Sequence, residues 1–410
     1  MTPKPDVVFV ERYFYPEGWG GAQIPRDITA ELARAGLRVA AVCGRDQYIA
    51  EKAGQSQDPR KHGVAIWYVP RYRLEKSTSK SILSQLWFCT IASVTIAFRG
   101  RPALFMVQTN PPLVVVALSA IAAILRRPLI LVAQDLYPEV MIVHGMLGAR
   151  SLLGRALTRM FRMAYQSAAC VVSLSPDMTR RLTEKGVAAE RIQEICNWAT
   201  GDPSVVRGSA NKMVSQWNLI GRFVVLYAGN LGMAHDAETI VRAVGIASSK
   251  VAQLRLIFVG EGGRTDATKR LVDELGLCEF VMFKPSVPME LLPHALGAAD
   301  LALVTLLPGF EGLVVPSKVF GHMARGIPTM YIGPRNGDIA VLLAKSSGGI
   351  ALENGDVAAA AACLVELAGD RSALERMGAS AARYYNEHLS RELGLAAYRK
   401  LVESVISRES

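Results

Sequence analysis

The stretch "ALFMVQTNPPLVVVALSAIAAILRRPLILVAQD", residues 103–135, decides the fold class of this chain. Its two ends, 103–110 and 128–135, are short apolar runs of the kind that form buried strands. Between them, two prolines open an apolar segment at 111–126 that is long enough for a helix. A strand, a helix and a second strand in succession indicate a parallel pair joined by a crossover helix. Because both strands are apolar throughout, we predict a parallel sheet covered by helices on both faces.

The same alternation continues on both sides of this stretch. In the first half, the pattern predicts further strands at 6–14, 38–44 and 169–175 and further helices at 20–36 and 81–99. In the second half, it predicts strands at 222–229, 254–260, 279–285, 300–306 and 328–333, with helices at 236–248, 263–276, 356–369 and 372–407. A polar segment with Gly, Pro and Ser at 195–221 interrupts the alternation and reads as a linker.

We therefore predict two doubly wound α/β domains. The first spans 1–200, the second spans 201–385, and a last helical segment, 386–410, closes the chain. A length of 410 residues suits two domains of about 200 residues each. Ligands of such sheets bind beyond the carboxyl ends of the strands, so the expected site is the cleft between the two domains.

The charge balance points to a phosphate-bearing or anionic partner. The net charge is +10, yet aromatic residues are not interleaved with the basic ones and no nucleic-acid-binding motif is present, so we expect no nucleic acid. Lys and Arg gather at 71–101 and at Arg126–Arg127, beside apolar segments. This combination suits an anionic membrane surface, and a solvated face beside core helices is the alternative. The apolar runs 111–125 and 128–133 are shorter than the roughly 20 residues that span a bilayer, so we expect no transmembrane helix.

The chain offers little sign of metal, disulfides or a targeting segment. Six cysteines are spread singly without CxxC spacing, which argues against a zinc site or a disulfide framework. The first 16 residues have no positive segment followed by a long apolar one, so we expect a first strand there and no signal peptide.

Three glycine-rich turns follow predicted strands and open helices. The first, "YPEGWGGAQ" at 15–23, contains Gly20 and Gly21. The second, in "YAGNLGMAHDAETIVRA" at 227–243, contains Gly229, Asn230, Gly232 and, just before the helix, His235. Glycine lets the backbone come close to a ligand, and the free N–H groups of a helix start attract phosphate or sugar oxygens. Tight packing turns and, for His235, a capping or surface role are the alternatives.

The third turn, in "FVGEGGRTDATKRL" at 258–271, contains Glu261 and Arg264. Its loop is expected to lie against a nucleotide base. Arg264 is either a phosphate partner or surface charge.

Lys318 stands out in "EGLVVPSKVFGHMARGIPTMYIG", residues 311–333. Pro316 fixes the backbone before a helix, and Ser317 is a candidate N-cap. A lysine in the first helical turn faces the positive end of the helix dipole. A bound anion would remove this conflict, so we predict that Lys318 holds a phosphate. A lysine that packs its stem and extends its head into water is the alternative.

Asp135 ends a buried strand in "VAQDLYPEVMIVHG", residues 132–145. A carboxylate at the carboxyl end of a central strand is where this architecture places chemistry. Asp135 is therefore a candidate to orient a sugar hydroxyl or to act as a base.

These motifs, in this order over nearly the whole chain, resemble the family 4 glycosyltransferases of the GT-B fold. The resemblance rests on the glycine turns and on "VQTNPP", "QDLYPE", "VVSLSPDMTRRLTEKGV", "RIQEICNWA" and "VPSKVFGHMARGIPT". The "NWA", "GNLG.AH" and "VPSK" forms are similar to the bacterial branch that builds surface polysaccharides, such as colanic acid and O-antigen. The resemblance implies two Rossmann-like domains, a last helix that crosses back to the first, and sugar transfer from a nucleotide sugar with retention of configuration. It implies no metal and no other cofactor.

The sequence departs from the family pattern in the second domain. A pair of glutamates eight residues apart would fall on Leu313 and Gly321, so the pair is absent, and Glu311 is a candidate substitute. An arginine and a lysine of many relatives are replaced by Asn230 and about His235. The resemblance therefore makes Lys318 the principal cation on the donor diphosphate.

The leading hypothesis is a retaining glycosyltransferase in which Lys318 and Asp135 carry the chemistry. The donor-binding residues would be Gly20, Gly21, Gly229, Asn230, Gly232, His235, Glu261, Arg264, Pro316, Ser317 and Lys318. The acceptor would be a saccharide on a polyprenyl diphosphate, and the protein would lie in the cytoplasm on the inner face of the plasma membrane. The alternatives are a nucleotide-sugar epimerase and a non-catalytic nucleotide-sugar or polysaccharide-binding protein. A dinucleotide oxidoreductase is not favoured, because no glycine turn has GxGxxG spacing followed by an acidic residue.

Overall fold

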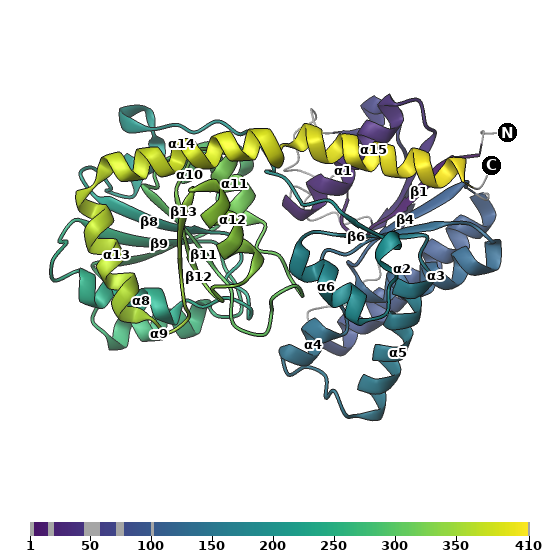
Figure 1. The fold of residues 1–410 in the computed structure, drawn as a ribbon, viewed down its shortest axis with the longest axis horizontal. Helices are drawn as coiled ribbons and strands as arrows, with labels where there is room; N and C mark the ends of the chain where they lie inside the picture. Colours follow the sequence, from purple (N-terminus) through teal and green to yellow (C-terminus); the bar gives the residue numbers. More distant parts are fainter. Residues whose placement is uncertain (1–3, 15–19, 45–57, 71–77, 100–101, 409–410) are drawn as a thin grey trace. The chain divides into compact units, whose positions relative to one another are not determined.

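The chain folds into two compact units, each built on one parallel sheet (Figure 1). The computed structural model describes residues 4–14, 20–44, 58–70, 78–99 and 102–408. Unit 1 comprises Met1–Asn197, Gly312–Val315 and Arg391–Ser410, and unit 2 comprises Trp198–Glu311 and Pro316–Ser390. The first boundary thus lies near the predicted residue 200. The four residues 312–315, which stand between two segments of unit 2, have no counterpart in the predicted domains.

Within the described residues, unit 1 holds a seven-stranded sheet in the order β3-β2-β1-β4-β5-β6-β7. The strands are β1 (Val7–Val10), β2 (Val39–Gly44), β3 (Ala65–Val69), β4 (Leu104–Gln108), β5 (Leu129–Val132), β6 (Cys170–Ser173) and β7 (Ile192–Glu194). The helices are α1 (Gly20–Arg34), α2 (Thr78–Arg99), α3 (Pro112–Leu125), α4 (Glu139–Val143), α5 (Leu152–Ser167), α6 (Pro176–Glu184) and α15 (Arg391–Ser407), with short 3₁₀ turns η2 (Pro59–His62) and η3 (Ala189–Arg191). Every pair of neighbouring strands is parallel, as the apolar strands predicted.

Alternation along the strands of unit 1 builds two cores. Val8, Val10 and Phe105 point to one face, where they pack with buried residues of α2, α3 and α5. Figure 1 shows these three helices together on one side of the sheet, while α1 and α15 run beside each other on the other side. Both faces of the sheet are therefore covered by helices, which explains why its central strands are apolar throughout.

Unit 2 repeats the plan with a six-stranded sheet, in the order β10-β9-β8-β11-β12-β13 over the described residues. The strands are β8 (Phe223–Ala228), β9 (Leu254–Val259), β10 (Val281–Lys284), β11 (Leu301–Thr305), β12 (Thr329–Ile332) and β13 (Gly349–Leu352). The helices are α7 (Lys212–Gln216), α8 (Glu238–Ala247), α9 (Thr265–Glu274), α10 (Leu292–Gly297), α11 (Lys318–Ala324), α12 (Asp338–Ser346), α13 (Val357–Gly369) and α14 (Arg371–His388), with 3₁₀ turns η4 (Gly208–Ala210) and η5 (Met289–Leu291). Buried residues of α8 and α13 cover one face, and those of α7 and α10 cover the other.

Each sheet has one point at which the strand order reverses. In unit 1 it lies between β1 and β4, and in unit 2 it lies between β8 and β11. The loops that leave the carboxyl ends of such neighbouring strands run in opposite directions and leave a crevice for a ligand. In unit 2 these are the loop that begins at Gly229 and the segment that leads from β11 to α11.

Several elements were not predicted. The edge strands β3, β7 and β13 and the helices α4, α5, α6, α10 and α12 were missed, and the predicted linker 195–221 contains α7. Asn211 caps α7, because its side-chain oxygen accepts hydrogen bonds from the backbone N–H groups of Met213 at 2.9 Å and Val214 at 3.3 Å. The predicted helix 372–407 is two helices, α14 and α15, separated by Leu389 and Ser390.

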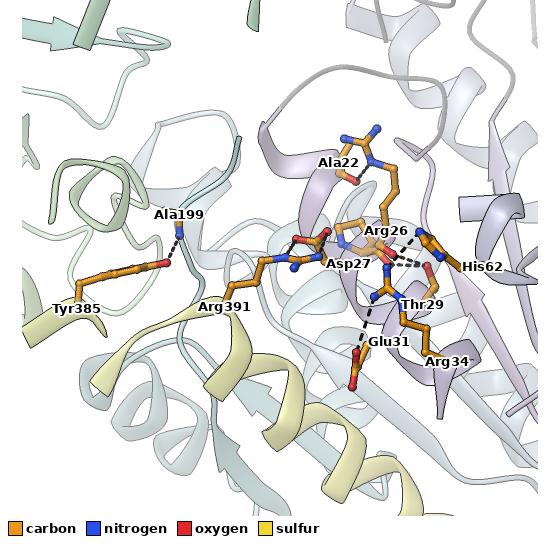
Figure 2. Close-up of polar contacts among 11 residues, drawn as sticks. Ala22, Arg26, Asp27, Thr29, Glu31, Arg34, His62, Ala199, Tyr385 and Arg391 are labelled. Atoms are coloured by element: carbon orange, nitrogen blue, oxygen red, sulfur yellow. Dashed lines mark hydrogen bonds and ion pairs between the residues drawn. The ribbon is translucent and has the colours of Figure 1, made fainter. Parts of the chain in front are cut away.

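The start of α15 is fixed to α1 by an ion pair within unit 1. Arg391 donates two hydrogen bonds to the carboxylate of Asp27, at 2.8 and 2.9 Å (Figure 2). Further along α15, Arg399 pairs with Glu31 at 3.6 Å. A bidentate arginine–carboxylate pair is directional as well as strong, so it sets the angle at which α15 meets α1.

Candidate functional site

The candidate donor site of unit 2 begins at the loop after β8. Tyr227, buried near the end of β8, donates a hydrogen bond from its hydroxyl to the carbonyl oxygen of Asn230 at 2.8 Å. Gly229 has a φ of +126°, a conformation that side chains rarely adopt. The predicted glycine turn is confirmed here, and its first glycine is required by the backbone. Gly232 has no such requirement, because a Cβ there would lie no closer than 3.6 Å to any neighbour.

Lys318 is the first residue of α11, and its ammonium group reaches back to the end of β8. The Lys318 Nζ donates to the Tyr227 hydroxyl and to the Asn230 carbonyl oxygen, the latter at 3.3 Å, and lies 3.8 Å from the centre of the Tyr227 ring. A Cβ on Gly229 would lie only 2.7 Å from the Lys318 Cε, so the absence of a side chain at Gly229 makes room for the lysine. The two motifs that the sequence singled out separately are thus parts of one arrangement.

The prediction that Ser317 caps α11 is wrong. Ser317 has helical backbone angles, φ −59° and ψ −14°, and its side chain makes no capping hydrogen bond. It is exposed, whereas Pro316 beside it is buried. A serine caps a helix only from an extended backbone, which turns its oxygen toward the first N–H groups.

Burial lowers the pKa of Lys318 to about 7. The ammonium form is disfavoured because the side chain lies among apolar and aromatic groups and no carboxylate among the described residues is paired with it. Two of the three N–H bonds of the ammonium group are directed at Tyr227 and Asn230, which leaves the third for a ligand. A diphosphate would supply the negative charge that this cation lacks.

His235 lies in the same loop, at the edge of the Tyr227 ring. The centres of the two rings are 5.7 Å apart, and the His235 Nδ1 lies 2.7 Å from the carbonyl oxygen of Thr305. A carbonyl oxygen only accepts, so Nδ1 carries the proton and Nε2 of the neutral ring is a hydrogen-bond acceptor. Burial, followed by the charges of Lys318 and Arg264, lowers the pKa of His235 to about 3. The ring is therefore neutral near pH 7.

Asp236 organises the start of α8 and was missed by sequence reasoning. Its carboxylate accepts hydrogen bonds from the Thr239 N–H at 3.1 Å, the Thr239 hydroxyl at 2.6 Å and the Asn354 amide at 2.9 Å. Its own N–H donates to the Thr305 hydroxyl at 3.1 Å. This network ties together the segments that leave β8, β11 and β13, and it holds His235 in place. The signal was present, because an Asp just before an apolar-periodic run is typical of a helix start.

The glycine loop after β9 supports the loop after β8. A Cβ on Gly262 would lie 2.3 Å from the Leu231 carbonyl oxygen, so the two loops pack backbone to backbone. Arg264 donates from Nε to the carbonyl oxygen of Met233 at 3.1 Å. Arg264 therefore bridges the loops, while Glu261 is exposed.

The glutamate pair that the family pattern expects is replaced by a different set of contacts. At Gly321, the guanidinium of Arg325 approaches within 3.5 Å of where a Cβ would stand, and it donates to the Gly321 carbonyl oxygen at 3.0 Å. The same guanidinium donates to the carbonyl oxygens of Thr200, at 3.2 Å, and of Asp202. Glu311 accepts a hydrogen bond from the N–H of Gly309 at 2.6 Å. Where the family pattern expects the second glutamate, Arg325 instead holds residues 200–202 against α11.

In unit 1, Asp135 stands just beyond the end of β5. Its N–H and that of Gln134 both donate to the Thr109 hydroxyl, at 3.1 and 3.0 Å, and its backbone forms an antiparallel bridge with Val314. The Gln134 side chain accepts a hydrogen bond from the Asn197 amide at 2.9 Å. Burial raises the pKa of Asp135 to about 6. A carboxyl group tuned in this way suits proton transfer near neutral pH.

The first glycine turn lies mostly outside the described residues. Gly20 and Gly21 are the first two residues of α1. One face of α1, with η2 and the start of α15, encloses a pocket of about 180 Å³ lined by Arg26, Asp27, Arg34, His62 and Arg391 among others. Arg34 and His62 are in contact there at 3.1 Å. Sequence reasoning did not find this pocket, because Arg391 is 364 residues from Asp27.

Two doubly wound parallel sheets, each with one switch point, define a two-domain α/β architecture, and comparison with known proteins identifies the family. Residues 20–198 match the "Glycosyl transferase 4-like domain" family and residues 222–370 match the "Glycosyl transferases group 1" family. The chain is 28% identical over 341 residues to "Probable glycosyltransferase WbjE" of Pseudomonas aeruginosa, covering 81% of this chain and 83% of that protein. It is 23% identical over 328 residues to WcaI of Escherichia coli K12, which is named for colanic acid biosynthesis, covering 76% of this chain and 79% of WcaI.

Solved structures share the fold. The Anabaena protein Alr3699/HepE, crystallised with UDP, superposes with a TM-score of 0.72 at 16% identity, covering 98% of this chain and 100% of that one. WaaG, a glycosyltransferase involved in lipopolysaccharide biosynthesis, superposes with a TM-score of 0.69 at 14% identity, covering 97% of this chain and 99% of WaaG. The fold is GT-B. The chain belongs to the family 4 glycosyltransferases, as the resemblance of its motifs predicted.

Proposed function

We propose that this chain is a retaining glycosyltransferase of surface polysaccharide assembly. It would move a sugar from a nucleotide-sugar donor to a saccharide carried on a polyprenyl diphosphate, in the cytoplasm at the inner face of the plasma membrane. WbjE and WcaI are named as glycosyltransferases, and HepE has been crystallised with UDP and with UDP-glucose, which supports this substrate class. The observation that carries the proposal is the position of Lys318. Its half-buried ammonium group lies at the end of β8, beside the switch point of unit 2, in space that a side chain at Gly229 would occupy.

Lys318 would bind the donor diphosphate and stabilise its charge as the sugar leaves. Cleavage of the bond between the anomeric carbon and the phosphate oxygen leaves a full additional charge on the diphosphate. A fixed ammonium group and the backbone N–H groups of Asn230 and Gly232 would offset that charge without rearrangement, whereas the N–H groups of Gly229 and Leu231 already donate to the carbonyl oxygens of Val259 and Glu261. We expect no cofactor and no metal ion to be needed, so turnover should persist in the presence of a chelator.

Asp135 would orient the acceptor hydroxyl. Its raised pKa keeps a fraction of the carboxyl group protonated near neutral pH, so the group can either donate to or accept from a sugar hydroxyl. Replacement by Asn keeps the shape and removes the ionisation. Asp135→Asn should lower kcat more than it lowers donor affinity, whereas a purely structural Asp135 would lower thermal stability and leave kcat per folded molecule unchanged.

His235 would recognise a hydroxyl of the transferred sugar and not a phosphate. Because Nδ1 donates to Thr305, the neutral ring has no N–H left for a phosphate oxygen, and its Nε2 can only accept. His235→Ala should then weaken binding of the nucleotide sugar and leave binding of the nucleoside diphosphate unchanged. An equal loss for both ligands would contradict this role and indicate a phosphate or ribose contact.

The test of the function is binding and turnover over a panel of UDP-, GDP- and dTDP-sugars. Thermal shift reports binding, and release of nucleoside diphosphate with a membrane lipid extract reports turnover. One donor should stabilise the wild type and release its nucleoside diphosphate, and Lys318→Gln should lose most of both. Lys284→Gln, on the edge strand β10, is the matched control and should behave as the wild type.

Two other functions would give different results. Saturable binding without turnover for every acceptor would indicate a non-catalytic nucleotide-sugar-binding protein. Conversion of the nucleotide sugar to its epimer without release of nucleoside diphosphate would indicate an epimerase.

A further inference from the structure

The outer face of α5, a helix that sequence reasoning missed, exposes several large apolar side chains. Its inner face is buried through Phe161 and Tyr165, as expected for a helix that covers a sheet. On its outer face, Leu152 is 85% exposed, Leu153 63% and Met163 58%. Isolated exposed apolar residues are ordinary, but several on one helix mark a surface that is covered in function.

The loop that leads into α5 adds to the same surface. Met146 is 65% exposed. The loop is held tightly against the first turn of α5, because a Cβ on Gly154 would lie 2.1 Å from the Gly148 carbonyl oxygen. Ser151 caps the helix by accepting a hydrogen bond from the Gly154 N–H at 3.0 Å. The apolar side chains thus stand on a rigid helix start. We call Met146, Leu152, Leu153, Met160 and Met163 the α5 surface.

The charge around the α5 surface has one sign. Residues 140–176 contain no Asp or Glu, while Arg150, Arg155, Arg159 and Arg162 are all exposed. Arg155, Arg159 and Arg162 line one open pocket on this helix. Several exposed arginines elsewhere in the protein, by contrast, pair with an acidic residue, as Arg242 does with Glu238 at 2.8 Å. A basic border around exposed Leu and Met suits an anionic partner with an apolar interior.

An anionic lipid bilayer has both properties. Leu and Met can enter the boundary between headgroups and acyl chains, and each arginine near the surface contributes about 1 kcal/mol by attraction to anionic lipid. A helix of 16 residues with arginines along it does not span a bilayer, and no helix among the described residues is long and apolar enough to do so. A surface-bound orientation is the one that its length and charge allow.

We propose that the α5 surface docks unit 1 on an anionic bilayer, with α5 lying in the plane of the headgroups. This rests on the proposed function only in that a lipid-linked acceptor requires the enzyme to work at a membrane. The α5 surface is not part of the basic segments 71–101 and Arg126–Arg127, which the sequence analysis proposed for an anionic membrane surface. Residues 71–77 and 100–101 of those segments lie outside the described residues.

The test is sedimentation of the full-length protein with vesicles, which needs no donor or acceptor. The vesicles contain phosphatidylcholine alone or phosphatidylcholine with phosphatidylglycerol. The wild type should bind only the vesicles with phosphatidylglycerol. The double variant Leu152→Ser/Leu153→Ser and the double variant Arg155→Gln/Arg159→Gln should each bind them at least tenfold more weakly. Ile220→Ser, which changes a residue that is 79% exposed in unit 2, should bind as the wild type.

Three outcomes would overturn the proposal. Absence of wild-type binding to the anionic vesicles would show that the surface has another occupant. Unchanged binding of both double variants would place the contact elsewhere. If the wild type is an oligomer and Leu152→Ser/Leu153→Ser is a monomer, the α5 surface is an interface between copies of this chain. Donor binding by the same variants, measured in parallel, should equal that of the wild type, so a failure of docking is distinguishable from a failure of the proposed transfer.

Discussion

Donor binding should take up a proton and weaken as the pH rises. Burial lowers the pKa of Lys318 to about 7 in the free protein, and a bound diphosphate should raise it well above that value. The ammonium form is the one that binds the diphosphate. The lysine is therefore competent below the free pKa and must acquire a proton above it, so affinity falls as pH rises through about 7.

The size of the effect follows from the fraction of protonated lysine. With a pKa of about 7, about half of the free protein is protonated at pH 7 and about 3% at pH 8.5. The dissociation constant of a nucleotide sugar should then rise about 16-fold over this interval, equivalent to about 1.6 kcal/mol. Proton uptake should rise from about half a proton to nearly one proton per molecule bound.

Isothermal titration calorimetry in buffers of different ionisation enthalpy measures both quantities, with the nucleotide sugar that stabilises the wild type most. The two controls change only Lys318. Lys318→Arg keeps its charge at every pH used, so its affinity should not depend on pH. Lys318→Gln should bind weakly at all pH values. A wild-type affinity that is constant from pH 7 to 8.5 without proton uptake, while Lys318→Gln still binds weakly, would show that Lys318 is fully charged in the free protein and would refute the burial argument.

Two further predictions concern packing. Gly229→Ala should destabilise unit 2 by about 1–3 kcal/mol in a urea titration, because the new methyl group would lie 2.7 Å from the Lys318 Cε and φ is +126°. The same variant should abolish the donor binding that depends on Lys318. Gly232→Ala, whose Cβ would lie at least 3.6 Å from any neighbour, should lower the free energy of unfolding by less, and equal effects of the two variants would contradict the steric reason. In a double-mutant cycle, Asp27→Ala and Arg391→Ala should show a coupling of about 1.5–3 kcal/mol, since the pair is bidentate and Asp27 is 9% exposed. A coupling near zero would mean that α15 is held by its apolar contacts alone.

Most strands and helices could be predicted from sequence, because buried positions carry apolar side chains and so produce a recognisable pattern along the chain. Strands such as β1, β4 and β8 are apolar on both sides, and this pattern survives without knowledge of their neighbours. The edge strand β7 is a short, polar Ile-Gln-Glu segment, so it has no such pattern. The helix α5 was missed although residues 152–167 are clearly amphipathic and begin after a capping serine, Ser151, so the pattern that predicts a helix was present in the sequence.

The candidate site was predicted in its parts and not in its assembly. Gly229 and Lys318 each stood out locally, but they meet only because β8 and β11 are neighbours in the sheet. The contact of Lys318 with Tyr227 spans 91 residues, and that of Arg325 with Thr200 spans 125. No local pattern encodes such pairings. The state of His235 likewise depends on the Thr305 carbonyl oxygen, a backbone atom of another strand.

The division of unit 1 into three chain segments has a consequence for how the protein is made. Its sheet is complete by residue 194, yet residues 312–315 and the helix α15 are translated much later. During synthesis, the ribosome releases nearly all of unit 2 before Arg391 is available to pair with Asp27. Until then the face of α1 that α15 covers is exposed, at the stage when a nascent domain is most open to chaperones and aggregation. The unit that begins to form first is thus the last to be completed.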